Sequence, residues 1–180
     1  MEYAVLGLLM LRNLTLYELN KSFQQGISLF YSASYGSLQF SVKKLLSSGY
    51  IEVEEKLENG RNKKIYSITT SGRELFLDWM RNGEIPATKL EAVALTKLFF
   101  LGVMDRIEDK RNILNRILET IQQIEEELKQ LDKDLSQLKV RESGNAIFHY
   151  QLKSLDYGMK AHQFAKSWFE EVLDSLEASP

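Results

Sequence analysis

The stretch YGSLQFSVKKLLSSGYI, residues 35–51, decides the fold of this chain. Leu38, Val42 and Leu45 follow the i, i+4, i+7 spacing that gives a helix one apolar face, and Gly49 supplies a glycine stop. Residues typical of a strand begin directly after that glycine. The stretch therefore predicts a short helix that leads at once into a β-strand.

The segments around this helix predict a complete supersecondary unit. The strand continues to Leu57, residues 58–62 form a turn with an Asn-Gly pair, and a second strand covers residues 63–69. Two helices precede this unit and one follows it. Three helices and a two-stranded ribbon with a basic tip are the layout of a winged helix-turn-helix, whose exposed helix and ribbon fit the grooves of duplex DNA.

Recurring capping boxes predict where further helices begin. The pattern of a Thr, Ser or Asp followed three residues later by Glu starts at Thr15, Ser71, Thr88 and Asp105. A largely buried first helix precedes Thr15, and residues 82–86 join two halves. The expected fold is mainly α with a small β-wing: a winged helix-turn-helix over residues 1–84 and a helical hairpin or coiled coil over residues 85–180.

The second half has the pattern of a dimerisation domain. Its apolar residues are spaced alternately by three and four, as in a coiled-coil seam, at Leu114, Ile117, Ile121, Ile124, Leu128, Leu131, Leu135 and Leu138. The last helix, residues 146–176, has two apolar stripes. One begins at Phe148, and the other contains Tyr150, Tyr157, Ala161, Phe164 and Trp168. One stripe can pack on the long helix, and the second predicts a homodimer interface.

The face opposite Leu38, Val42 and Leu45 is the expected DNA-reading surface. Lys43 and Lys44 would neutralise phosphates, Gln39 would pair with an adenine edge, and Phe40 would touch a thymine methyl group. With the ribbon tip, the full set of expected DNA contacts is Ser34, Tyr35, Ser37, Gln39, Phe40, Lys43, Lys44, Arg61, Lys63 and Lys64. The alternative is that these are solvated positions on a small α+β domain.

Several motifs occur in order along the chain: AVLGLL (4–9), YEL (17–19), YGSL (35–38), GYI (49–51) and YSITTSGR (66–73). With Leu155-Asp156-Tyr157-Gly158 near the end, they resemble the PadR family of transcriptional regulators. The resemblance implies a dimeric winged-helix repressor, often controlled by a small aromatic or drug-like effector. Leu16 stands where the family usually has glycine, and Gln39-Phe40 where it usually has Tyr-Pro, so the operator sequence does not transfer.

Composition limits the other classes of function. The net charge is −2; residues 1–85 hold ten Lys or Arg and nine Asp or Glu, a balance of +1. That weak basicity keeps open an alternative, a winged-helix adaptor that binds a protein and no DNA. The chain has no cysteine, no apolar run long enough to span a membrane, no export signal and no nucleotide-binding or hydrolase motif. We expect a cytoplasmic protein that is not an enzyme and has no cofactor or metal.

Large aromatic residues could form an effector pocket. They are Trp79, Phe99, Phe100, Tyr150, Tyr157, Phe164 and Trp168. Such residues can sandwich a flat ligand. Filling of the core and the dimer interface is the favoured interpretation, since large residues in helical stripes are typical of interfaces.

Overall fold

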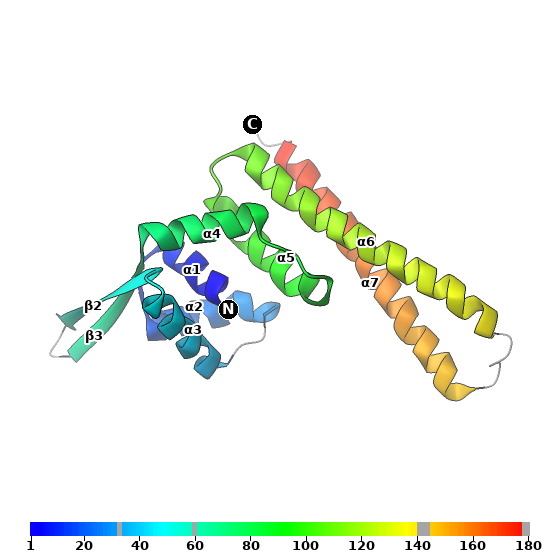
Figure 1. The fold of residues 1–180 in the computed structure, drawn as a ribbon, viewed down its shortest axis with the longest axis horizontal. Helices are drawn as coiled ribbons and strands as arrows, with labels where there is room; N and C mark the ends of the chain where they lie inside the picture. The colour runs from blue at the N-terminus through cyan, green and yellow to red at the C-terminus, as the bar shows by residue number, and fades with distance from the viewer. Residues whose placement is uncertain (32–33, 59–60, 140–144, 178–180) are drawn as a thin grey trace. The chain divides into compact units, whose positions relative to one another are not determined.

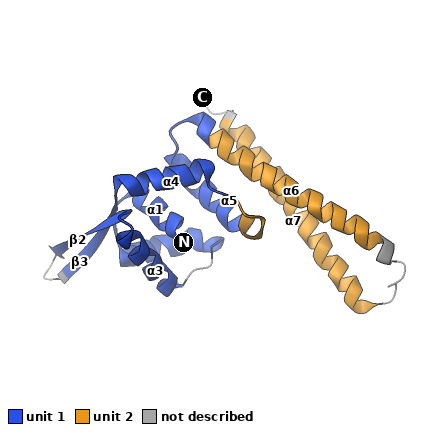
Figure 2. Cartoon of the chain, in the orientation of Figure 1, with its two compact units in different colours: residues 1–84, 91–109 blue, residues 85–90, 110–180 orange. Residues whose placement is uncertain are grey.

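The computed structural model describes residues 1–31, 34–58, 61–139 and 145–177, and only the backbone of Glu58, Arg61, residues 137–139 and Glu177. The chain divides into two compact units (Figures 1 and 2). The first contains residues 1–84 and 91–109, and the second contains residues 85–90 and 110–180.

The first unit contains a winged helix. Its helices are α1 (Glu2–Leu11), α2 (Leu16–Gln24), α3 (Tyr35–Ser47) and α4 (Thr70–Asn82), with a short 3-10 turn, η1 (Ile27–Leu29). Its strands are β1 (Leu14–Thr15), β2 (Ile51–Glu58) and β3 (Arg61–Ile68), all antiparallel in the order β1-β3-β2. Figure 1 shows β2 and β3 as the two long strands of the wing. The predicted order of helices and ribbon is therefore confirmed, with one addition, the two-residue strand β1.

Helix α1 is buried along most of its length, as its apolar sequence predicts. Residues Ala4 to Leu9 are all buried, because α1 packs against α2, α3, α4 and β3. The chain then enters β1, and Thr15 begins α2 with a capping box. The Thr15 hydroxyl accepts the N–H of Glu18, and the Glu18 carboxylate accepts the N–H of Thr15 at 2.8 Å. This box was predicted from the sequence.

The turn from α3 into β2 requires a glycine. Gly49 has a φ of 71°, a left-handed conformation that favours glycine. The N–H of Gly49 donates to the carbonyl of Leu46, and the N–H of Tyr50 donates to the carbonyl of Leu45. These two bonds form a Schellman motif and satisfy the open carbonyls at the end of α3. The predicted glycine stop is confirmed.

The start of α4 differs from the prediction. Thr69, and not Ser71, caps the helix, because its hydroxyl lies at the end of β3 and accepts the N–H of Gly72 at 3.1 Å. Ser71 lies inside the first turn, where its hydroxyl donates to the carbonyl of Gly49. The other predicted starts are approximate: α5 is Leu90–Phe99 and α6 is Ile107–Lys139, each beginning two residues after the predicted cap.

Most of α5 lies in the first unit, although the sequence break at residues 82–86 suggested a boundary before it. The reason is Lys97, which is fully buried and donates from Nζ to the carbonyls of Trp79 and Met80 near the end of α4. A short 3-10 turn, η3 (Leu101–Val103), follows α5. The functional division at residue 84 stays a prediction, since compactness does not test which segment dimerises.

The second unit begins with a 3-10 turn, η2 (Ala87–Lys89), and contains most of α6 and all of α7 (Ala146–Glu177). The predicted seam is buried at Leu114, Ile117 and Ile121 and opens toward the far end, where Leu131 is exposed; the side chain of Leu138 lies outside the described residues. Glu125 lies in a run of three glutamates, a pattern typical of a solvated helix face. It is instead buried, with Lys129 and Lys166 at 4.0 and 3.9 Å.

Candidate nucleic-acid interface

Helix α3 buries one face and exposes the other. Leu38, Val42 and Leu45 are each no more than 2% exposed, as predicted. On the opposite face the side chains of Tyr35 and Phe40 are 49% and 68% exposed. Gln39 and Lys43 are exposed as well, and Ser37 is half-buried. Aromatic, amide and ammonium groups thus share an open helical surface of the kind that enters a major groove.

The two serine hydroxyl groups at the start of α3 make hydrogen bonds to the backbone of its first turn. The Oγ of Ser34 accepts the N–H of Ser37 at 3.1 Å, and the Oγ of Ser37 donates to the carbonyl of Ser34 at 2.7 Å. Ser34 is therefore the N-cap of α3, and its side-chain oxygen already accepts a hydrogen bond. A phosphate here would be attracted chiefly by the positive end of the helix.

The two lysines of α3 are not equivalent. The Nζ of Lys44 lies 2.8 Å from Oε1 of Glu2 in α1, and this hydrogen bond raises the pKa of Lys44. Lys43 is exposed and, among the residues that the structure describes, makes no ion pair or hydrogen bond. The sequence had assigned the same role to both residues.

The sequence predicted three cations at the wing, and the structure describes the side chains of two of them, Lys63 and Lys64. The Nζ of Lys64 lies 3.1 Å from Oε1 of Glu55 on β2, and hydrogen bonds from Asn62 and Lys64 lower the pKa of Glu55. Lys63 is exposed on β3. Arg61 begins β3, but its side chain lies outside the described residues, as do Asn59 and Gly60. The predicted DNA contact of Arg61 stays a prediction.

A basic groove lies between α2 and β3, and the sequence did not predict it. Its volume is about 1010 Å³. The charged groups that line it are Arg12, Lys21, Lys63, Lys64 and one acid, Glu18, which also belongs to the capping box of α2. The groove forms because β1 pairs with β3 and brings α2 beside the wing. A two-residue strand leaves no periodic signal, so sequence reasoning had no means of finding it.

The aromatic residues proposed for an effector pocket fall into two sets, one in each compact unit. In the first unit, Trp79 is buried and stacks on Tyr3 at 4.5 Å between ring centroids, and Phe100 is buried against Phe76. Phe99 is half-exposed beside Phe100. Trp79 and Phe100 are therefore core residues.

In the second unit, the predicted aromatic residues lie along one side of α7. Tyr150, Tyr157 and Phe164 are 70%, 76% and 72% exposed, and Trp168 is 37% exposed. The other stripe faces α6, where Leu155 and Phe169 are buried. The structure thus separates the two stripes of α7 into a covered face and an open one.

Neither a metal site nor a membrane-spanning helix is found among the described residues. No group of three or more His, Asp or Glu residues there is placed to hold a metal ion. His162 donates from Nδ1 to the carbonyl of Gly158 at 2.8 Å, in line with a structural role. No described helix is both long and apolar enough to cross a membrane.

Known proteins and domains that resemble this chain indicate the class of protein to which the winged helix belongs. Residues 14–82 match the family described as a winged helix DNA-binding domain. The chain is 31% identical over 110 residues to the negative transcriptional regulator PadR of Bacillus subtilis, an alignment that covers 60% of each protein. It is also similar to the crystal structure of Bacillus subtilis PadR in complex with operator DNA, with 24% identity, coverage of 97% and 98%, and a TM-score of 0.45. The chain is likewise similar to the crystal structure of Bacillus subtilis PadR in complex with p-coumaric acid, with 22% identity, coverage of 98% of each chain, and a TM-score of 0.41.

The fold and the domain match place residues 14–82 in the class of winged helix DNA-binding domains. In sequence the chain is similar to PadR-family regulators, as its match to the Bacillus subtilis relative shows.

Proposed function

We propose that this chain is a transcriptional repressor that binds operator DNA as a homodimer. The observation that carries the proposal is the open face of α3, where Gln39, Phe40 and Lys43 are exposed together at a capped helix N-terminus. This surface suits a major groove, and the basic groove between α2 and β3 suits the adjacent phosphates. A regulator of this family is not expected to be an enzyme, and we expect it in the cytoplasm with the DNA.

The open stripe of α7 supports the homodimer. Tyr150, Tyr157 and Phe164 recur every seven residues, so they form one apolar ridge along the helix. A ridge of exposed aromatic residues is typical of an interface, and a second copy presents the same ridge. Two winged helices related by a twofold axis would read an inverted repeat, with half-sites about one helical turn apart or a multiple of it.

Control by a small molecule is part of the proposal. PadR of Bacillus subtilis has been crystallised with p-coumaric acid. We infer that an effector releases this chain from its operator. The alternative, a winged-helix adaptor without DNA contact, is favoured only by the near-neutral charge of residues 1–85.

Fluorescence anisotropy tests the proposal. A labelled duplex from directly upstream of the chain's own gene is titrated with protein at 50 and 200 mM salt, with excess random duplex as competitor. A repressor binds tightly, resists the competitor and loses about 10³-fold or more in affinity at the higher salt if six or more phosphates are contacted. Absence of binding at low salt, to this duplex and to a pool of random duplexes, would favour the adaptor.

A further inference from the structure

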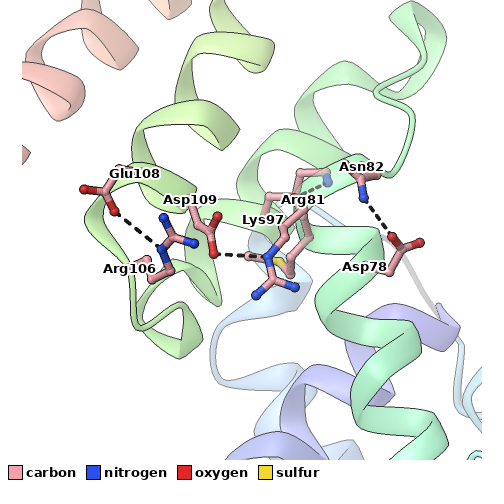
Figure 3. Close-up of polar contacts among 8 residues, drawn as sticks. Asp78, Arg81, Asn82, Lys97, Arg106, Glu108 and Asp109 are labelled. Atoms are coloured by element: carbon pink, nitrogen blue, oxygen red, sulfur yellow. Dashed lines mark hydrogen bonds and ion pairs between the residues drawn. The ribbon is translucent and has the colours of Figure 1, made fainter.

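Charged side chains near the end of α4 and the start of α6 are arranged in pairs. The Nε of Arg81 lies 3.1 Å from Oδ2 of Asp109, and the Nε of Arg106 lies 3.7 Å from Oε2 of Glu108 (Figure 3). Each of these two cations has an acid beside it, so that the opposite charges largely cancel at a distance. The wing is arranged differently, because its acids and its bases lie mostly on different strands.

The two long strands of the wing have opposite charge. Strand β2 contains four glutamates and one lysine, a balance of −3, whereas β3 contains one arginine, two lysines and no acid, a balance of +3. The side chains of Glu52, Glu54 and Glu55 are exposed, and so are those of Lys63 and Lys64. The ribbon therefore has an acidic strand and a basic strand.

The order of the strands decides which of them borders the basic groove. In the order β1-β3-β2, β2 is an edge strand on the opposite side of β3 from β1. The groove is lined by residues 12–25 and by β3, whereas the described residues of β2 lie outside it. The acidic strand is thus the outer edge of the ribbon, and the side toward α2 is basic.

The glutamates of β2 have different partners. Oε1 of Glu55 lies 3.1 Å from Nζ of Lys64, which lines the groove. Glu54 pairs with Lys56 of its own strand at 3.1 Å. Among the described residues, the only hydrogen-bond partner of the Glu52 carboxylate is a hydroxyl group, at 3.2 Å. Glu55 therefore acts on a cation of the groove, whereas Glu52 and Glu54 keep their charge on the outer edge.

We propose that Glu52 and Glu54 are specificity-determining residues, which keep phosphates away from the outer edge of the wing. When the open face of α3 lies in an operator, the groove takes the adjacent phosphates and β2 is turned away from the duplex. Other orientations on DNA bring the acidic edge against phosphates, where like charges repel. Because non-specific binding is almost entirely electrostatic, this repulsion weakens binding to wrong sites more than binding to the operator.

This inference rests on the proposed repressor function, and anisotropy titrations with two duplexes of equal length test it. One is the operator duplex from upstream of the chain's own gene, and the other has a random sequence. At 0.1 M salt, charges act over about 10 Å. Glu52→Gln with Glu54→Gln should bind the random duplex about fivefold more tightly than wild type does, as expected for two exposed like charges. Operator affinity should change by less than about twofold, so the ratio of the two affinities falls.

Two control variants separate this effect from net charge. Glu126→Gln with Glu127→Gln removes the same charge from exposed positions of α6 in the second unit, and should leave both affinities within about twofold of wild type. Glu55→Gln removes a charge from the same strand but releases Lys64 toward the groove. It should tighten binding to both duplexes by similar factors, because a phosphate contact carries no sequence information.

An unchanged ratio in the β2 double variant, with a wild type that prefers the operator, would overturn this inference alone. Equal tightening of both duplexes, or an equal fall of the ratio in the α6 double variant, would show an effect of net charge and also overturn it. A wild type without preference for the operator would overturn the repressor function and this inference with it. Light scattering checks that the altered edge strand does not pair between copies. If it does, Glu52→Gln alone carries the test, with an expected effect of about twofold.

Discussion

The ammonium group of Lys44 in α3 lies 2.8 Å from the carboxylate of Glu2 in α1, whereas Lys43, one residue earlier, makes no such pair among the described residues. The pair neutralises one of the two charges that α3 could offer to a phosphate. Glu2 also places a negative charge beside the proposed DNA surface. The pair therefore leaves Lys43 as the more available of the two lysines of α3.

Lys43→Ala should therefore weaken operator binding more than Lys44→Ala. We expect Lys43→Ala to lower the slope of log affinity against log salt by about 1, as for the loss of one phosphate contact. Anisotropy titrations at several salt concentrations measure that slope. Glu2→Gln is the informative companion, because it releases Lys44 and should tighten binding. Equal slopes for both alanine variants would refute the asymmetry.

Lys21 of the basic groove provides a separate test of the DNA footprint. It is exposed on α2 and lies outside the contacts that the sequence predicted. Lys21→Ala should weaken binding to operator and random duplex by similar factors, because a phosphate contact carries no sequence information. Lys89→Ala, an exposed lysine of the second unit, is the matched control. If both variants bind like wild type, the groove does not contact DNA.

The helices and the ribbon could be predicted because their signals are local. Leu38, Val42 and Leu45 lie on successive turns of α3 and share one face, and Gly49 ends α3 through its own backbone conformation. The capping box at Thr15 likewise requires only residues four positions apart or closer. Such features depend on short-range geometry, which a single sequence contains.

The unpredicted parts depend on contacts between distant residues. Lys44 and Glu2 are 42 positions apart, and the groove needs β1 to pair with β3. Thr69, and not Ser71, is the cap of α4. The N–H of Thr69 donates to the carbonyl of Tyr50, and this contact with a distant residue holds the end of β3 in place. The burial of Glu125 also depends on a distant residue, since one of the cations near it, Lys166, comes from α7.

Gly72 should tolerate no side chain. A Cβ there would lie 1.9 Å from the carbonyl oxygen of Tyr50, a backbone atom that is fixed by its hydrogen bond from Thr69. Gly72→Ala should therefore lower the free energy of unfolding by about 2 kcal/mol or more, although alanine is the better helix former. Urea denaturation measures the change. Gly102→Ala is the control, because a Cβ there meets no atom within 4 Å.

Glu18 should make stability depend on pH. The hydrogen bonds from the backbone and side chain of Thr15 lower its pKa below the ordinary value of 4.5. A lowered carboxyl pKa stabilises the fold above the pKa of the unfolded chain, and this contribution is lost as the pH falls through the folded value. Glu18→Gln should thus be less stable than wild type by under about 1 kcal/mol at pH 7, because the site is exposed.

The measurement is urea denaturation of both proteins between pH 7 and pH 3. The difference in unfolding free energy should be constant down to about pH 5 and shrink below it, as expected for a glutamate with a lowered pKa. A difference that stays constant to pH 3 would show that the charge of Glu18 does not stabilise α2.

The open ridge of α7 should control the oligomeric state. Tyr157 and Phe164 are more than 70% exposed in one chain, so their replacement by glutamate costs the single chain little. In a homodimer the same change buries unpaired charges on both sides of the twofold axis. Tyr157→Glu with Phe164→Glu should therefore give a folded monomer by light scattering, with circular dichroism as a check of helix content.

Gln163→Glu is the matched control, because it adds a charge at an exposed position of α7 outside the ridge. It should remain a dimer. The monomeric variant should also bind a single half-site and the full inverted repeat with similar affinity, because no second winged helix is tethered to it. A double variant that remains dimeric would assign the interface to another surface, and one that still prefers the full repeat would show that dimerisation through α7 is not needed for operator recognition.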